Sequence, residues 1–80
     1  MRAQVFVRLR SGVLDVQGKT VEHGLRHLGY EGVGDVRIGK LVEFSVDAPT
    51  EAEARKQVEE ICEKLLANPV IEDFEISFSQ

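Results

Sequence analysis

A short chain that can form no internal disulfide has to hold its fold by packing alone. This chain has one cysteine, Cys62, among 80 residues. A chain of this length buries only about 60% of the surface that its unfolded state exposes. An isolated monomer would therefore be marginally stable. We expect a single domain spanning residues 1–80, and its small size favours assembly into oligomers.

The charge balance restricts the partners that the chain can bind. Ten Lys and Arg residues stand against fourteen Asp and Glu residues, which gives a formal net charge of −4. Nucleic acids and anionic membranes need a basic face, so neither is an expected partner. The sequence has no apolar run of about 18 residues and no segment that resembles a signal peptide. These features predict a cytoplasmic protein.

In two segments, apolar and other residues alternate with the period of two that is typical of a half-buried strand. In residues 3–10, Ala3, Val5 and Val7 point one way while the residues between them point the other. A second strand is predicted from about residue 70 to residue 78. Its apolar face carries Phe74, Ile76 and Phe78.

Residues 33–47 also read as extended structure, but their pairing is open. The apolar residues of this segment all have even numbers: Val36, Ile38, Val42 and Phe44. A two-residue hairpin turn at Gly39 and Lys40 would place the apolar residues before the turn and those after it on opposite faces of the sheet. A bulge at Gly39 would restore one shared face. Burial of both faces, or a single long bent strand, would also agree with the pattern.

A first helix is predicted from about Val16 to Leu28. Asp15 is placed to cap it, because a carboxylate can accept hydrogen bonds from the free amides of the first turn. Gly29 suits its C-terminal end. We expect Gly18 and Gly24 to permit close backbone packing against the sheet or a neighbouring subunit. The predicted buried stripe consists of Val21, Leu25 and Leu28.

A second helix begins at a capping box formed by Thr50 and Glu53. Asn68 and Pro69 end it, because the residue before a proline disfavours the α conformation. The predicted apolar stripe consists of Ala54, Val58, Ile61, Cys62, Leu65 and Leu66. On this stripe Cys62 is expected to behave as a core residue and not as a nucleophile.

The predicted order of elements is β-α-β-β-α-β, in which the third strand depends on how residues 33–47 fold. This order favours an α+β two-layer sandwich of ferredoxin-like type, in the broad α/β class. The two helices are expected on one face of an antiparallel sheet.

The sequence offers no catalytic or metal-binding constellation. His23 and His27 have the i, i+4 spacing of a helical metal site, but no third ligand is evident and Arg26 lies beside them. We interpret them as a solvated or interface pair. Arg37 and Lys40 flank a glycine near a predicted strand end, where two cations could bind a carboxylate or phosphate of a partner.

Three strings in fixed order carry a family resemblance that runs over nearly the whole chain. They are Val13–Gly18, Asp35–Lys40 and Cys62–Phe74. In order and spacing they resemble the small PurS subunit of phosphoribosylformylglycinamidine (FGAM) synthase. Two positions depart from the family pattern: Val16 stands where a proline is often expected, and Phe74 where a tyrosine is frequent.

The resemblance implies a subunit of an ATP-dependent amide-nitrogen ligase in purine biosynthesis, with no catalytic residues of its own. Its expected partners are a glutaminase subunit, which releases ammonia, and a synthetase subunit, which uses ATP and Mg²⁺. The small subunit would bridge the two, assist ammonia transfer and form a homodimer or homotetramer, with no cofactor bound to this chain. The partner contacts that the two shorter strings imply are Asp15, Gln17, Gly18, Arg37, Gly39 and Lys40.

A ligand-sensing regulatory domain is the alternative function. An ACT-like module has a similar order of strands and helices and is also small, acidic and oligomeric. It would bind an amino acid at a subunit interface, which a direct binding titration would detect.

Overall fold

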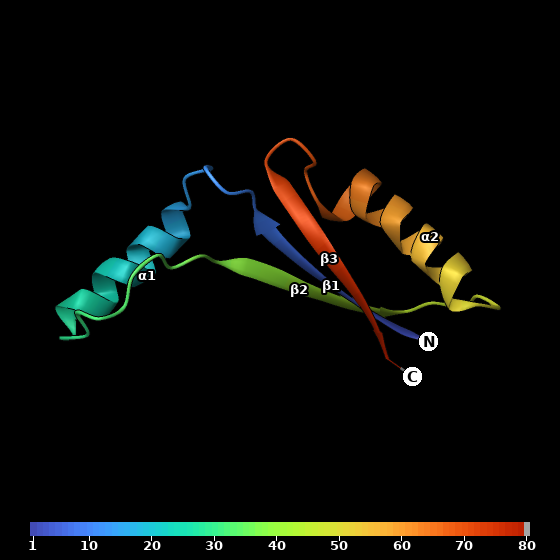
Figure 1. Ribbon diagram of the computed structural model, residues 1–80, viewed down its shortest axis with the longest axis horizontal. Helices are drawn as coiled ribbons and strands as arrows, with labels where there is room; N and C mark the ends of the chain where they lie inside the picture. Colours follow the sequence, from blue (N-terminus) through green and yellow to red (C-terminus); the bar gives the residue numbers. More distant parts are fainter. Residues whose placement is uncertain (80) are drawn as a thin grey trace.

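The computed structural model describes residues 1–79 as a three-stranded antiparallel sheet with two helices (Figure 1). The central strand pairs with both of the others, so the strand order is β2-β1-β3. In chain order the elements are β1 (Arg2–Leu9), α1 (Val16–His27), β2 (Gly39–Ser45), α2 (Glu51–Ile61), the π-helical turn η1 (Cys62–Leu66) and β3 (Glu72–Ser79). The predicted α+β class is therefore confirmed.

The hydrophobic core lies between one face of the sheet and α2. In the register of the strands, Val5 stands opposite Val42 on β2 and Ile76 on β3, so three apolar side chains share that face. From the helix side, Val58 and Cys62 pack onto this face and are fully buried. Cys62 is thus a core residue, as its place on the apolar stripe predicted.

The π-helical turn changes which face of the second helix is buried. The amide of Ala67 donates to the carbonyl of Cys62, five residues earlier, at 2.9 Å. This wider turn shifts the helical phase, so Leu66 packs against the core while Leu65 is 80% exposed. The predicted stripe is therefore correct at Ala54, Val58, Cys62 and Leu66 but wrong at Leu65. Ile61 is also exposed.

The position of α1 differs from the prediction, because only α2 covers the sheet. Figure 1 shows α1 projecting beyond the end of the strands, and the chain measures 51 × 27 × 14 Å. The predicted stripe on α1 is not buried: Val21 is 42% exposed and Leu28 is 73% exposed. The buried residues of this helix are Gly18 and Glu22, which face the segment that returns to the sheet.

The returning segment, residues 30–38, forms no strand in the part of the chain that the structure describes. The predicted fourth strand and the hairpin turn at Gly39 are therefore wrong, and a long bent segment is the nearest of the three alternatives. The physical reason is that this segment packs against the start of α1, where the carbonyl of Val36 lies against Gly18, so it is held away from the neighbouring strand. The amide of Ile38 also donates to Asp15.

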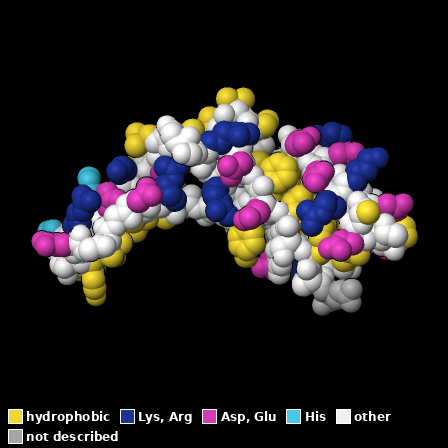
Figure 2. Space-filling model, in the orientation of Figure 1, with side chains coloured by type: hydrophobic (Ala, Val, Ile, Leu, Met, Phe, Trp, Pro, Cys, Tyr) yellow, Lys and Arg dark blue, Asp and Glu magenta, His cyan; other side chains and the backbone are white. Residues whose placement is uncertain are grey.

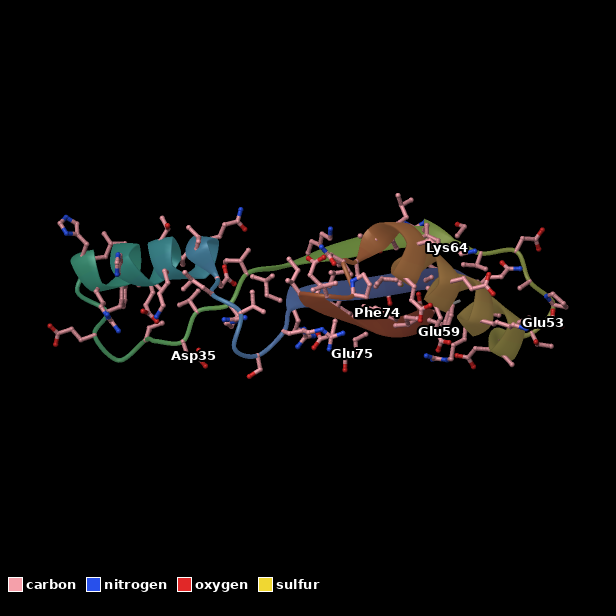
Figure 3. All side chains as sticks on the ribbon, turned by 90° about the horizontal axis from the view of Figure 1, so that it is seen from above. Asp35, Glu53, Glu59, Lys64, Phe74 and Glu75 are labelled. Atoms are coloured by element: carbon pink, nitrogen blue, oxygen red, sulfur yellow. The ribbon has the colours of Figure 1, made fainter. Side chains whose placement is uncertain are left out.

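We call residues 12–38 the arm and the remaining described residues the body. Seen from above, the arm and the body lie end to end, with Asp35 on the arm and Glu53, Glu59 and Phe74 on the body (Figure 3). Among residues 1–79, no helix combines the length and the apolar character that a membrane span requires.

Candidate functional site

The residues predicted to contact a partner come together where the arm joins the body. Asp15, Gln17, Gly39 and Lys40 line a groove of about 370 Å³, which we call the junction groove. Arg37 lines a second groove of about 320 Å³ beside it, and Gly39 and Lys40 are shared by both. The fold thus brings two strings that are about twenty residues apart in the sequence to one place.

Asp15 joins the start of α1 to the returning segment. Its Oδ1 accepts a hydrogen bond from the amide of Gly18 and its Oδ2 accepts one from the amide of Ile38, both at 2.7 Å. The side chain is only 4% exposed. The amides of Ile38 and Gly18, with a smaller effect of Arg37, lower the pKa of Asp15 below its ordinary value of 3.8. The predicted helix cap is confirmed, and it has a second partner that the sequence did not reveal.

Gly18 allows the returning segment to approach the helix closely. A Cβ atom built on Gly18 would clash with the carbonyl oxygen of Val36, so no other residue fits here without moving that backbone. The expected close backbone packing is present here, although the neighbour is the returning segment and not the sheet. A Cβ atom built on Gly24 would have no neighbouring atom within 4 Å. Close packing within this chain therefore does not explain the glycine at position 24.

Arg37 and Lys40 have different surroundings. The guanidinium of Arg37 donates to the carbonyl oxygens of Val13, Arg10 and Leu9 at 3.0, 3.2 and 3.4 Å. It therefore holds the loop between β1 and α1 in place. Lys40 is exposed, and no ion pair or hydrogen bond joins its side chain to another of the described residues. Of the two cations, Lys40 is the one whose charge is available to a partner.

Sequence reasoning missed Glu22, a charged residue that is only 4% exposed. Burial opposes its charge, but the backbone amides of Asp35 and Val36 and the cations of Lys19 and Arg26 outweigh that effect and lower the pKa of Glu22 below 4.5. Both cations lie 3.6 Å from its Oε2. The spacing of these three charged residues on α1 was a visible signal of ion pairing. No local signal predicted that Glu22 would be buried.

The histidines of α1 and the acidic residues of α2 and η1 do not form a second site. His23 and His27 are both exposed, as are Glu59 and Glu60 on α2 and Glu63 on η1. Within residues 1–79, no three His, Cys, Asp or Glu side chains are grouped in a way that could hold a metal ion.

The fold and the junction groove define a small α+β protein in two parts, with the groove at the place where they meet. Residues 2–80 match the family model of PurS, phosphoribosylformylglycinamidine (FGAM) synthase. The chain therefore belongs to the PurS family, as the three strings indicated.

Relatives and solved structures agree with this membership. The chain is 49% identical to the PurS subunit of phosphoribosylformylglycinamidine synthase from Synechocystis over 71 residues, which cover 89% of this chain and 71% of the relative. The structure of Bacillus subtilis PurS has a TM-score of 0.88 at 42% identity and covers 99% of this chain and 98% of its own. A chain in the structure of PurLQS from Thermotoga maritima has a TM-score of 0.87 at 36% identity, covering 95% and 93%.

The two glycines of α1 provide a matched test of the close approach at the arm. We expect Gly18→Ala to destabilise the chain by about 1–3 kcal/mol, because the added methyl group displaces the backbone at Val36. Gly24→Ala makes the same chemical change in open space and should stabilise the helix by about 0.5–1 kcal/mol. Urea unfolding at one protein concentration measures both. Equal effects of the two substitutions would contradict the role of Gly18.

The two buried carboxylates predict a stability loss in acid. Because folding lowers the pKa of Asp15 and of Glu22, their contribution to stability is complete above their ordinary values and is lost as the pH falls through the lowered ones. The free energy of unfolding should therefore decline below about pH 4. The Asp15→Asn, Glu22→Gln double variant should be less stable at pH 7 and decline less steeply between pH 5 and pH 3. An equally steep decline in this variant would show that other groups cause it.

Proposed function

We propose that this chain is the small, non-catalytic subunit of an FGAM synthase and acts in the cytoplasm. In this proposal it bridges a glutaminase subunit and a synthetase subunit and assists the transfer of ammonia between them. The observation that carries the proposal is the likeness of the chain, over 95% of its length, to a chain in the structure of PurLQS from Thermotoga maritima. ATP and Mg²⁺ would bind to the synthetase subunit, and this chain would bind no cofactor.

The junction groove supports a contact with one of the two larger subunits. Three of its lining side chains, those of Arg8, Gln17 and Lys40, are polar and exposed, and Arg8 is paired with Glu75. The other predicted contact residues already form hydrogen bonds within the junction: Asp15 with the amides of Gly18 and Ile38, and Arg37 with the carbonyl of Val13. In the proposed assembly, Gln17, Gly39 and Lys40 therefore contact the partner, while the other three predicted residues shape the surface.

Reconstitution with the two larger subunits tests the proposal. The glutaminase and synthetase subunits are mixed with glutamine, ATP, Mg²⁺ and formylglycinamide ribonucleotide, and turnover is measured with and without this chain. We expect glutamine-driven turnover to require the chain and ammonia-driven turnover to be independent of it. Equal glutamine-driven turnover without the chain would refute the bridging role, and amino-acid titration would then test the ligand-sensing alternative.

The same assay tests the contact residues. The Gln17→Ala, Lys40→Ala double variant should raise the concentration of this chain needed for half-maximal turnover by about tenfold. The matched control is Lys56→Ala with Gln57→Ala, which removes the same two side chains from the exposed surface of α2. A similar loss in the control would show that the effect is not specific to the junction groove.

We also propose that the chain forms a homodimer or homotetramer through the arm. Figure 2 shows apolar side chains along the lower edge of the arm. The exposed large apolar residues of the arm are Leu14, Val16, Val21, Leu28, Tyr30 and Val33. Many exposed large apolar residues on one short segment are typical of a site covered by another protein chain. A second copy would cover it on a chain whose own core is small.

Sedimentation velocity tests the oligomeric state. The unmodified chain should sediment as a dimer or a tetramer, and Val21→Ser with Leu28→Ser should shift it to a smaller species, because both changes reduce the apolar surface of the arm. Leu65→Ser is the control, since Leu65 is about as exposed as Leu28 but lies on η1. A monomeric parent chain, or an unchanged double variant, would contradict assembly through the arm.

A further inference from the structure

One face of the sheet is not covered by a helix in the part of the chain that the structure describes. Val5 and Val7 point toward α2, so the residues between them on β1 point the other way (Figure 1). On this open face Phe6 stands directly opposite Leu41 of β2, and the two side chains are 42% and 49% exposed. The open face therefore presents two neighbouring large apolar residues to solvent.

A groove adjoins this apolar pair. It is the second of the two grooves at the junction, with a volume of about 320 Å³, and Phe6, Gly39 and Leu41 line it. We call it the open-face groove. Gly39 is opposite Arg8 in the register of the strands, and a Cβ atom at Gly39 would lie 2.7 Å from the carbonyl oxygen of Val7. The backbone therefore excludes a side chain at this position, which leaves space beside Phe6 and Leu41.

Three cations line the open-face groove, and none of its described lining residues is an Asp or a Glu. They are Arg8, Arg37 and Lys40, on a chain whose formal net charge is −4. Glu75 pairs with Arg8 at 3.0 Å, but no ion pair joins Arg37 or Lys40 to another of the described residues. The hydrogen bonds of Arg37 go to carbonyl oxygens, which are neutral. The groove therefore carries a positive charge, which favours a partner that brings a carboxylate.

The two grooves at the junction use different faces of the sheet and differ in charge. Leu9 and Glu72 line only the junction groove and are paired on the face that α2 covers. Phe6 and Leu41 line only the open-face groove, on the opposite face. The carboxylates of Asp15 and Glu72 offset the cations of the junction groove, an offset that the open-face groove lacks among its described lining residues. A chain that bridges two subunits needs two separate contact surfaces, and these grooves provide surfaces of different chemistry.

We propose that the open-face groove is a second docking site of this chain, separate from the junction groove. This inference rests on the proposed bridging function. The occupant is a segment of the larger subunit that the junction groove does not bind, and it carries an apolar side chain next to an Asp or a Glu. The apolar side chain packs against Phe6 and Leu41, and the cations that line the groove stabilise the carboxylate.

Binding of the full chain to each purified larger subunit tests the site. The Kd for the glutaminase subunit and the Kd for the synthetase subunit are measured separately by isothermal titration calorimetry. Phe6→Ser with Leu41→Ser should raise one Kd about tenfold or more and leave the other unchanged, because the apolar contact is lost. Gln17→Ala, in the junction groove alone, should weaken binding to the other subunit. The matched control, Ile61→Ser with Leu65→Ser, removes two exposed apolar side chains from α2 and η1 and should change neither Kd.

Two substitutions at Leu41 separate the effect of charge from that of packing. Leu41 is about half exposed on an edge strand, so neither change disturbs the core. Leu41→Glu and Leu41→Lys remove the same apolar contact, but only Leu41→Glu brings a negative charge to the groove. Leu41→Glu should therefore raise the affected Kd about fivefold more than Leu41→Lys does, and high salt should reduce this difference.

Other outcomes would overturn the inference. Equal effects of Leu41→Glu and Leu41→Lys would show that the partner brings no carboxylate. Weaker binding of the Phe6, Leu41 variant to both subunits, or an equal loss in the control, would show that the effect is not specific to the open face. A change in the sedimentation of this variant on its own would assign the groove to a second copy of the chain. If the parent chain binds neither subunit, the bridging function fails as well, whereas binding of both subunits by the parent and by all variants alike removes this inference alone.

Discussion

The position of the arm relative to the sheet depends on the two hydrogen bonds that the Asp15 carboxylate accepts. One comes from the first turn of α1 and the other from Ile38, just before β2 begins. Together they fix where the chain leaves the sheet and where it returns. Because Arg37 binds the carbonyl groups of the same loop, this junction is a polar cluster of fixed geometry. The arm, the junction groove and the start of β2 all take their positions from it.

Different interactions stabilise the body and determine the shape of the arm. Burial of apolar side chains stabilises the body, where β1 is covered by α2, while the hydrogen bonds to the buried Asp15 carboxylate and the close approach of Val36 to Gly18 give the arm its shape. Keeping apolar residues such as Leu28 out of the core leaves them available on the surface of the arm. For a member of the PurS family, a projecting helix with an open apolar side is consistent with a chain that works within an assembly.

Much of the fold was predictable because its signals are local. Alternation identified β1 and β3, side-chain capping located the starts of both helices at Asp15 and Thr50, and Pro69 explained why the second helix ends. The errors have two sources, contacts between distant residues at α1 and a local change of helical phase at η1. Periodicity marked Val21 and Leu28 as apolar but could not say what would cover them. It marked Leu65 for the core, but η1 moved it to the surface.

The sequence by itself determined the class of fold, the ends of the helices, the core role of Cys62 and the family, because each follows from neighbouring residues or from strings read in order. Only the tertiary structure decided that α1 leaves the sheet, that Arg37 supports a loop, and that the amide of Ile38 meets the carboxylate of Asp15. These features depend on backbone groups, and every residue carries the same backbone groups whatever its side chain. The identity of a residue therefore gives no sign of which distant carboxylate its amide will meet.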